Sequence, residues 1–191
     1  MIRALAYLVV GWVLIAVGGG LADVFMITVM LPATSVVLLT HIAFSRAMPL
    51  SMGLALAVSF GYLEDLHQGA PVGTLTLAFA LAFLALSWAA ERIAVSGWPT
   101  RMLSAFFGVV LVDLLTAGIL AVLAEPLGFR REALWVALWD ARWHCIATAL
   151  VAPPVWTLFE RLFSLLKIEE PRAPDGPSPL GPVSYTHLTL P

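Results

Sequence analysis

Long apolar stretches with short polar breaks between them make up most of the chain. They run over 5–22, 24–44, 49–63, 72–90, 102–124 and 143–163. A helix needs about 20 mainly apolar residues to cross a bilayer, and most of these stretches reach that length. The third is short, so its span has to include Glu64 and Asp65. The second contains Pro32, so its helix begins either near Val24 or near Pro32. The pattern predicts an all-α polytopic membrane protein with about six transmembrane helices.

The composition excludes a soluble domain and several kinds of site. Of the 191 residues, 61% are hydrophobic and 12% are charged, whereas soluble domains average about 45–50% apolar and about 25% charged residues. The formal net charge of −2 provides no basic field for nucleic-acid binding. A single cysteine, Cys145, excludes an internal disulfide and a cysteine-clustered metal site. Since about six spans use most of the length, we expect one transmembrane domain over 1–167.

The ten basic residues are expected to divide unequally between the two membrane faces. With six spans and the N-terminus inside, Arg130 and Arg131 lie outside and Arg142 lies near a face. The remaining seven lie on the cytoplasmic side, namely Arg3, Arg46, Arg92, Arg101, Arg161, Lys167 and Arg172. This excess follows the positive-inside rule, so both termini are predicted to be cytoplasmic. A cleaved signal peptide over 1–22 is the alternative, but it would leave the N-terminus outside, against the charge distribution.

Two segments after the last apolar stretch are expected to lie outside the fold. Residues 168–182 are rich in proline and polar side chains, a composition that predicts a disordered cytoplasmic tail. Residues 183–191 match, residue for residue, one reading frame of a transposon-end sequencing adapter. We expect this ending to be an adapter translation and not native sequence.

The most informative polar run joins the third and fourth apolar stretches and continues a stripe of small residues. Gly53, Ala57, Gly61 and Asp65 recur every four residues and therefore share one helix face. Small residues let helix backbones approach closely in lipid, so we expect this helix to be central and Asp65 to face protein. The turn that follows has residues suited to a tight reversal, namely Gly69, Pro71 and Gly73.

The role of Asp65 stays open on the sequence alone. A carboxylate at the end of a span either hydrogen-bonds the following turn or serves a function, because its insertion cost falls towards the headgroups. Glu64 points to another face and is expected to be solvated. His67 adds a third possible metal ligand, but a metal site needs a further partner that the sequence does not supply. We therefore predict no metal site in this run.

Two other ionisable residues, His41 and Asp113, fall inside apolar stretches. Asp113 lies near the middle of 102–124, where an acid costs about 2.5–3.5 kcal/mol to insert, so some group has to satisfy it. The candidates are His41, Thr116 on the same helix, and a group of a partner protein. Inter-helix hydrogen bonding, transport and catalysis all remain open for these intramembrane polar residues.

An aromatic stripe precedes the last span. Trp135, Trp139 and Trp143 are spaced at i, i+4 and i+8. Tryptophan prefers the membrane interface, so residues 132–143 predict an amphipathic segment on the outer surface. The stripe is either an interfacial aromatic belt or a docking surface for a partner. Further along, Pro153-Pro154 should kink or locally unwind the last helix.

Catalytic and cofactor signatures are missing from the sequence. It has no nucleophile elbow, no His-Glu-x-x-His, no P-loop and no Gly-x-Gly-x-x-Gly. Without the adapter ending, its histidines are not paired at the spacing of metal ligands. We therefore expect a protein that is not an enzyme and that carries no cofactor or metal.

The chain resembles the bacterial rod shape-determining protein MreD family. The resemblance covers roughly 1–167 and rests on the run Gly61-x-Leu-x-Asp65-Leu-x-x-Gly69-x-Pro71-x-Gly73. Weaker support comes from the second span beginning with Pro32, from Thr148-Ala-Leu-Val-Ala-Pro153, and from Arg161-Leu162. Departures from the family pattern are the Trp-rich segment at 135–143, the second proline Pro154, and Glu64 beside Asp65.

The resemblance implies a fold and a role. MreD-like proteins are similar to the six-helix substrate-binding subunits of energy-coupling-factor vitamin transporters. The implied role is a non-enzymatic scaffold in the inner membrane of a bacterium. It would bind the single-pass protein MreC and, indirectly, the filament protein MreB and the peptidoglycan polymerase and transpeptidase of the cell-elongation machinery. This role would help maintain rod shape and lateral wall synthesis.

A transporter subunit is the competing hypothesis. In that hypothesis the six helices enclose a small-molecule pocket near the outer face, with Asp113 or His41 as polar contacts. An ATPase module would couple from the cytoplasm. The scaffold hypothesis needs only helix packing from the stripe that ends at Asp65, and an outer or lipid-facing surface that holds the partner.

Overall fold

The computed structural model describes residues 2–25, 32–46, 48–68, 71–93, 95, 97–127 and 131–165. Within these ranges, the side chains of 19, 21–25, 124–127, 131–137 and 140 lie outside the description. The predicted tail 168–182 and the adapter-like ending 183–191 also lie outside the described residues.

In the described ranges every regular element is an α-helix, which confirms the all-helical expectation. The helices are α1 (Ile2–Phe25), α2 (Thr34–Ser45), α3 (Leu50–Gln68), α4 (Thr74–Ala90), α5 (Trp98–Leu127) and α6 (Arg131–Leu165). Helix α2 begins just after Pro32 and not near Val24. This start agrees with one of the two expected positions, because a proline is tolerated at the beginning of a helix but disrupts its interior.

Helix α6 is longer and more continuous than the sequence predicted. The Trp-rich segment and the last span form one helix of 35 residues. Pro153 and Pro154 lie inside it, so the expected local unwinding does not occur. The hydroxyl of Thr157 donates to the carbonyl of Pro153 at 2.8 Å, an extra bond in the turn that follows the two prolines.

Two of the described helices are long and apolar enough to cross a membrane. These segments are Trp98–Leu123 in α5 and Ala141–Leu165 in α6. Helix α2 has 12 residues and therefore spans only about 18 Å, less than the hydrocarbon core of about 30 Å. By length and composition, the described helices thus include fewer clear spans than the six expected.

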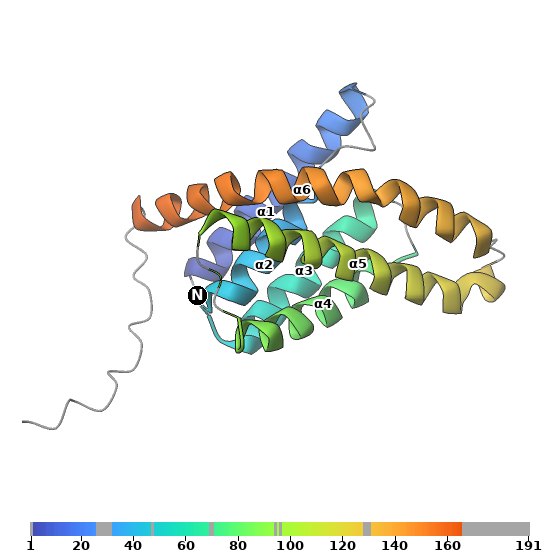
Figure 1. Cartoon of the computed structure of the whole chain (residues 1–191), viewed down its shortest axis with the longest axis horizontal. Coiled ribbons are helices and arrows are strands. Elements are labelled where there is room, and N and C mark those ends of the chain that lie inside the picture. The colour runs from blue at the N-terminus through green and yellow to red at the C-terminus, as the bar shows by residue number, and fades with distance from the viewer. Residues whose placement is uncertain are drawn as a thin grey trace, which may run out of the picture.

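The helices form one bundle in which α5 and α6 run along each other and project together beyond the others (Figure 1). Helices α3 and α4 make a second closely packed pair. Helix α2 packs against each of the other five helices, and nine of its residues are buried. The short α2, and not α3, is therefore the central helix, because its polar side chains Ser35, Thr40 and His41 are buried together with its apolar ones.

The core lies around α2, whereas the outward faces of α5 and α6 are apolar and exposed. Leu38 and Leu39 of α2 are fully buried and belong to one apolar cluster with Phe60 of α3. On α5, Phe107 is 56% exposed and Val122 is 79% exposed. Such an exterior is unlike that of a soluble monomer, which rarely leaves large contiguous apolar patches uncovered.

Candidate functional site

The junction between α3 and α4 is built around the buried carboxylate of Asp65, which is 2% exposed. Its Oδ1 accepts a hydrogen bond from the backbone N–H of Leu75 at 2.8 Å. Its Oδ2 accepts three more, from the backbone N–H of Gly73 at 2.9 Å and from the backbone N–H and hydroxyl of Thr76 at 3.1 and 2.7 Å. One side chain of α3 therefore holds the first turn of α4.

The local sequence explains why α4 needs this carboxylate. The first N–H groups of a helix have no partner within the helix, and a negative charge is favourable beside them. The N-cap of α4 is Gly73, whose φ of 100° suits glycine and whose missing side chain can make no capping bond. Asp65 supplies that bond from the end of the preceding helix.

The small residues of the stripe bring α3 against α4. A Cβ on Gly61 would lie 2.6 Å from the Cα of Thr76 and 2.7 Å from the carbonyl oxygen of Leu75. A Cβ on Gly53 would lie 2.3 Å from the ring of Phe83. Ala57 between them is fully buried. We call this contact, with Asp65 at its end, the α3–α4 joint.

The reversal between the two helices is only partly described. The carbonyl of Pro71 accepts the backbone N–H of Thr74 at 3.1 Å, which closes the turn before α4. Gly73 has the positive φ that a reversal requires. Gly69 lies outside the described residues.

The neighbours of Asp65 behave differently from one another. Glu64 was expected to be solvated, but its Oε1 accepts the hydroxyl of Ser35 at 2.5 Å and its Oε2 accepts Gln68 at 3.0 Å. Glu64 is half-buried and therefore only partly solvated, because the start of α2 lies beside this face of α3. His67 is exposed and bonds the carbonyl of Leu63 in its own helix at 2.9 Å.

His41 lies in the core and does not reach Asp113. Its Nδ1 is hydrogen-bonded to the hydroxyl of Tyr7 in α1 at 2.9 Å. Its ring packs against that of Trp156 of α6 in a T-shaped arrangement, with centroids 5.1 Å apart and planes at 85°. His41 therefore joins α1, α2 and α6, and it is not the described hydrogen-bonding partner of Asp113, for which it was one of three candidates.

Asp113 faces a cleft between α5 and α6. Its Oδ2 lies 3.7 Å from the thiol of Cys145, a weak donor. The cleft has a volume of about 440 Å³, within the usual range for small-molecule sites. Apart from Asp113, Cys145 and Arg142, its lining side chains are hydrophobic, and they include Phe106, Val110, Leu114, Leu138 and Ile146. We call this hollow the α5–α6 cleft.

Arg142 lies at the rim of the α5–α6 cleft between two exposed tryptophans. Its guanidinium carbon is 4.2 Å from the ring centroid of Trp139 and 5.5 Å from that of Trp143. It also donates to the carbonyl of Trp139 at 3.1 Å. Trp139 and Trp143 are 68% and 44% exposed, and the side chain of Trp135 lies outside the described residues.

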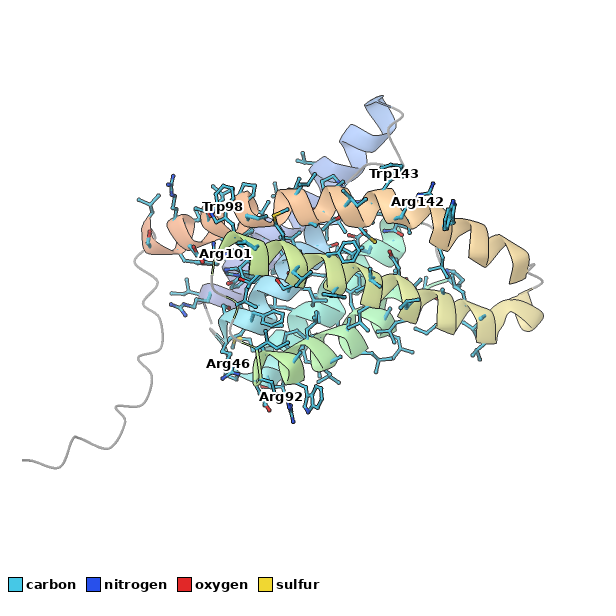
Figure 2. All side chains as sticks on the ribbon, in the orientation of Figure 1. Arg46, Arg92, Trp98, Arg101, Arg142 and Trp143 are labelled. Carbon is cyan, nitrogen blue, oxygen red and sulfur yellow. The ribbon has the colours of Figure 1, made fainter. Side chains whose placement is uncertain are left out.

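Three arginines that are far apart in the sequence gather at the opposite end of the bundle. Figure 2 shows Arg46, Arg92 and Arg101 at one end and Arg142 towards the other. Arg46 donates to the carbonyl of Ala90 at the end of α4. Arg92 stacks on Trp88 at 3.9 Å, and Arg101 pairs with Glu160 at 2.7 Å. The fold thus separates these basic residues from Arg142.

Some of these partners were not predicted from the sequence. Thr76 had only a weak local signal, its position in the first turn of a helix, where N–H groups need an acceptor. The partners Tyr7 and Cys145 had none, since pairing across helices depends on the fold. Among the residues that the structure describes, no group of three or more His, Cys, Asp or Glu side chains could hold a metal ion.

The class of protein follows from these features. Over the described residues it is a bundle of α-helices, with two helices that are long and apolar enough to cross a membrane, a tight polar joint between α3 and α4, and a partly polar cleft between α5 and α6. No family model, curated protein or solved structure matches the chain. The resemblance to MreD and to the vitamin-transporter subunits therefore stays a prediction from the sequence.

Proposed function

We propose that the protein is a non-enzymatic scaffold of the bacterial cell-elongation machinery, similar in role to MreD. In this proposal the bundle spans the inner membrane several times and binds MreC. Through MreC it connects to MreB and to the peptidoglycan polymerase and transpeptidase. Its work is to hold these partners in place during lateral wall synthesis.

The observation that carries the proposal is the structural role of the Gly61–Gly73 run. This run is the strongest basis of the resemblance, and in the structure its aspartate, Asp65, accepts four hydrogen bonds from the start of α4. Gly61 touches the backbone of the same turn. Such residues shape a rigid surface, whereas a catalytic acid needs access to a substrate.

Membrane insertion is supported by what the exterior presents. The outward faces of α5 and α6 carry exposed large apolar side chains, among them Leu103, Phe107, Leu150 and Leu158. Exposing such apolar surface to water is unfavourable, whereas lipid tails cover it without that cost. We place Trp139 and Trp143 at the headgroup level of the outer face, where tryptophan is enriched.

The proposed orientation uses the separation of the arginines. Arg46, Arg92 and Arg101 lie at one end of the bundle (Figure 2), and the positive-inside rule assigns such an end to the cytoplasm. Both termini are then cytoplasmic, and Arg142 lies near the outer face.

Purification of the tagged full chain from native membranes tests the scaffold. We expect MreC to be recovered with the unmodified protein and to decrease with Asp65→Ala, in step with rounding of the cells. His67→Ala is the matched control, because His67 lies two residues away, is exposed, and bonds only within its own helix turn. Absence of MreC from a folded, unmodified preparation would refute the proposal.

A transporter subunit is the second candidate, and the α5–α6 cleft favours it. The cleft holds an acid and a base in apolar surroundings, as a site for a polar small molecule requires. This candidate predicts that an ATPase module, and not MreC, is recovered in the same purification.

A further inference from the structure

The α5–α6 cleft is lined by two groups of opposite charge, one from each helix. Asp113 contacts Cys145, and Arg142 lies three residues before Cys145 on α6. Three residues correspond to a rise of about 4.5 Å along a helix. Arg142 is at the start of the apolar segment Ala141–Leu165, so Asp113 lies about one turn deeper.

The hydrogen bonds described for these two groups leave most of their capacity unused, although the Asp113 carboxylate also interacts electrostatically with His144 of α6. The only hydrogen bond described for the Asp113 carboxylate comes from a thiol at 3.7 Å, which is a weak donor. Arg142 is exposed and uses one guanidinium nitrogen for the carbonyl of Trp139, and a guanidinium has five N–H donors. A ligand that places an anion at Arg142 and an N–H donor at Asp113 would complement both groups.

The rest of the cleft specifies an apolar body for that ligand. Phe106, Val110, Leu114 and Ile146 line it, and the exposed faces of α5 and α6 continue beside it. Trp139 and Trp143 flank the arginine, as expected at headgroup level, and Figure 2 shows Trp143 near Arg142. The occupant is therefore an amphiphile with its chain in the cleft and its headgroup at the rim.

We propose that the α5–α6 cleft binds a phospholipid whose headgroup carries both a phosphate and a primary ammonium, as in phosphatidylethanolamine. The phosphate binds the Arg142 guanidinium, which matches phosphate oxygens in a bidentate manner. The two-carbon arm turns inward and brings the ammonium to the Asp113 carboxylate. One acyl chain lies along the apolar lining. The proposal shares with the scaffold function only the insertion of α5 and α6 in a membrane.

Native mass spectrometry of the purified full chain tests this assignment. Phosphatidylethanolamine and phosphatidylcholine with identical acyl chains are compared, since they share the phosphate but phosphatidylcholine has no N–H on its headgroup. We expect phosphatidylethanolamine to be retained about tenfold more, the size expected for a hydrogen bond between charged groups. Equal retention of the two lipids by the unmodified protein would overturn the site.

Four variants locate the binding. Asp113→Asn should bring the ratio of the two lipids to within about twofold, whereas Arg142→Gln should lower retention of both. Arg92→Gln is the matched control, because Arg92 also stacks on a tryptophan, Trp88, but lies at the opposite end of the bundle. Ala141→Leu fills the cleft from its own lining and should also lower retention of both lipids.

The remaining outcomes also decide the proposal. A preference that survives Asp113→Asn, or an Arg92→Gln effect equal to that of Arg142→Gln, overturns it. If Asp113→Asn is not recovered folded, unchanged lipid retention by folded Ala141→Leu overturns it instead. MreC recovery from the same membranes reports on the scaffold separately, so loss of one result does not imply loss of the other.

Discussion

Two aspartates whose side chains the structure describes, Asp65 and Asp113, have opposite environments. Asp65 in the α3–α4 joint accepts four hydrogen bonds, three of them from backbone N–H groups. Asp113 in the α5–α6 cleft has one described hydrogen bond, from a thiol, and faces a hollow of about 440 Å³. A saturated carboxylate stabilises the fold, whereas one with spare acceptor capacity beside a cleft is available to a ligand.

The packing around the two aspartates differs in the same direction. In the joint, glycine and alanine let the helices approach until no Cβ fits on Gly61. In the cleft, the large side chains of Phe106, Leu114 and Ile146 leave a space between α5 and α6. The comparison teaches that small residues close the α3–α4 contact, whereas bulky side chains leave a local hollow within the otherwise closely packed α5–α6 pair.

Gly61→Leu should have the largest effect, because its new side chain meets the backbone of Thr76 and Leu75, which cannot move aside. We expect a loss of stability of at least about 3 kcal/mol and little folded protein. The measurement is the yield of monodisperse protein in detergent. Gly118→Leu in α5 is the matched control, since nothing lies within 4 Å of a Cβ there. Equal yields for the two variants would break the comparison.

Exchanging each aspartate for asparagine should separate the two environments next. Asp65→Asn removes a charge from four hydrogen bonds, and we expect a loss of about 3 kcal/mol of unfolding free energy. Asp113→Asn should change the unfolding free energy by less than about 1 kcal/mol, because the exchange removes a buried charge whose described hydrogen bond is weak. Unfolding of the purified protein in a denaturing detergent measures both. A larger loss for Asp113→Asn would reverse the assignment of the structural acid.

The sequence predicted the joint better than the cleft, for a physical reason. The four-residue spacing from Gly53 to Asp65 fixes a shared helix face, and Gly73 marks the following reversal, so both are local properties. The contact between Asp113 and Cys145 joins residues 32 positions apart, and nothing local specifies it. Local patterns therefore predict which face is buried but not which distant group it meets.

The same limit explains the errors at α2 and at Glu64. An apolar helix without a polar face is typical of a buried element, but apolar residues on all sides are also expected of a span in lipid. The sequence therefore did not identify α2 as the central helix. Glu64 was placed on the correct side of α3 relative to Asp65, but the nearby Ser35 hydroxyl comes from α2. The solvation of Glu64 therefore depends on a contact with a helix that is distant in the sequence.

Removing one hydrogen-bond donor that contacts each aspartate should change the unfolding free energy in the same order, with a smaller difference between the two sites. Thr76→Val removes the hydroxyl that donates to Asp65 at 2.7 Å, and we expect a loss of about 1–2 kcal/mol. Cys145→Ala removes the thiol beside Asp113, and we expect its polar contribution to be below about 0.5 kcal/mol. Cys145→Ala also removes the apolar contact of the buried sulfur. That contribution is measured separately with Cys145→Ala in an Asp113→Asn background, which completes a double-mutant cycle. A coupling energy above that of Thr76 with Asp65 would contradict the comparison.

The smallest effect is expected where a side chain is enlarged inside the cleft. Ala141→Leu places its new atoms in the space between α5 and α6, so we expect the unfolding free energy to change by less than about 1 kcal/mol. Ala57→Leu makes the same exchange in the fully buried joint, where overpacking should cost about 1–3 kcal/mol. Because both exchanges add the same atoms to a helix, a difference between their effects reports the free volume around each alanine. If Ala141→Leu were as destabilising as Ala57→Leu, the space beside Asp113 would not be open to an occupant.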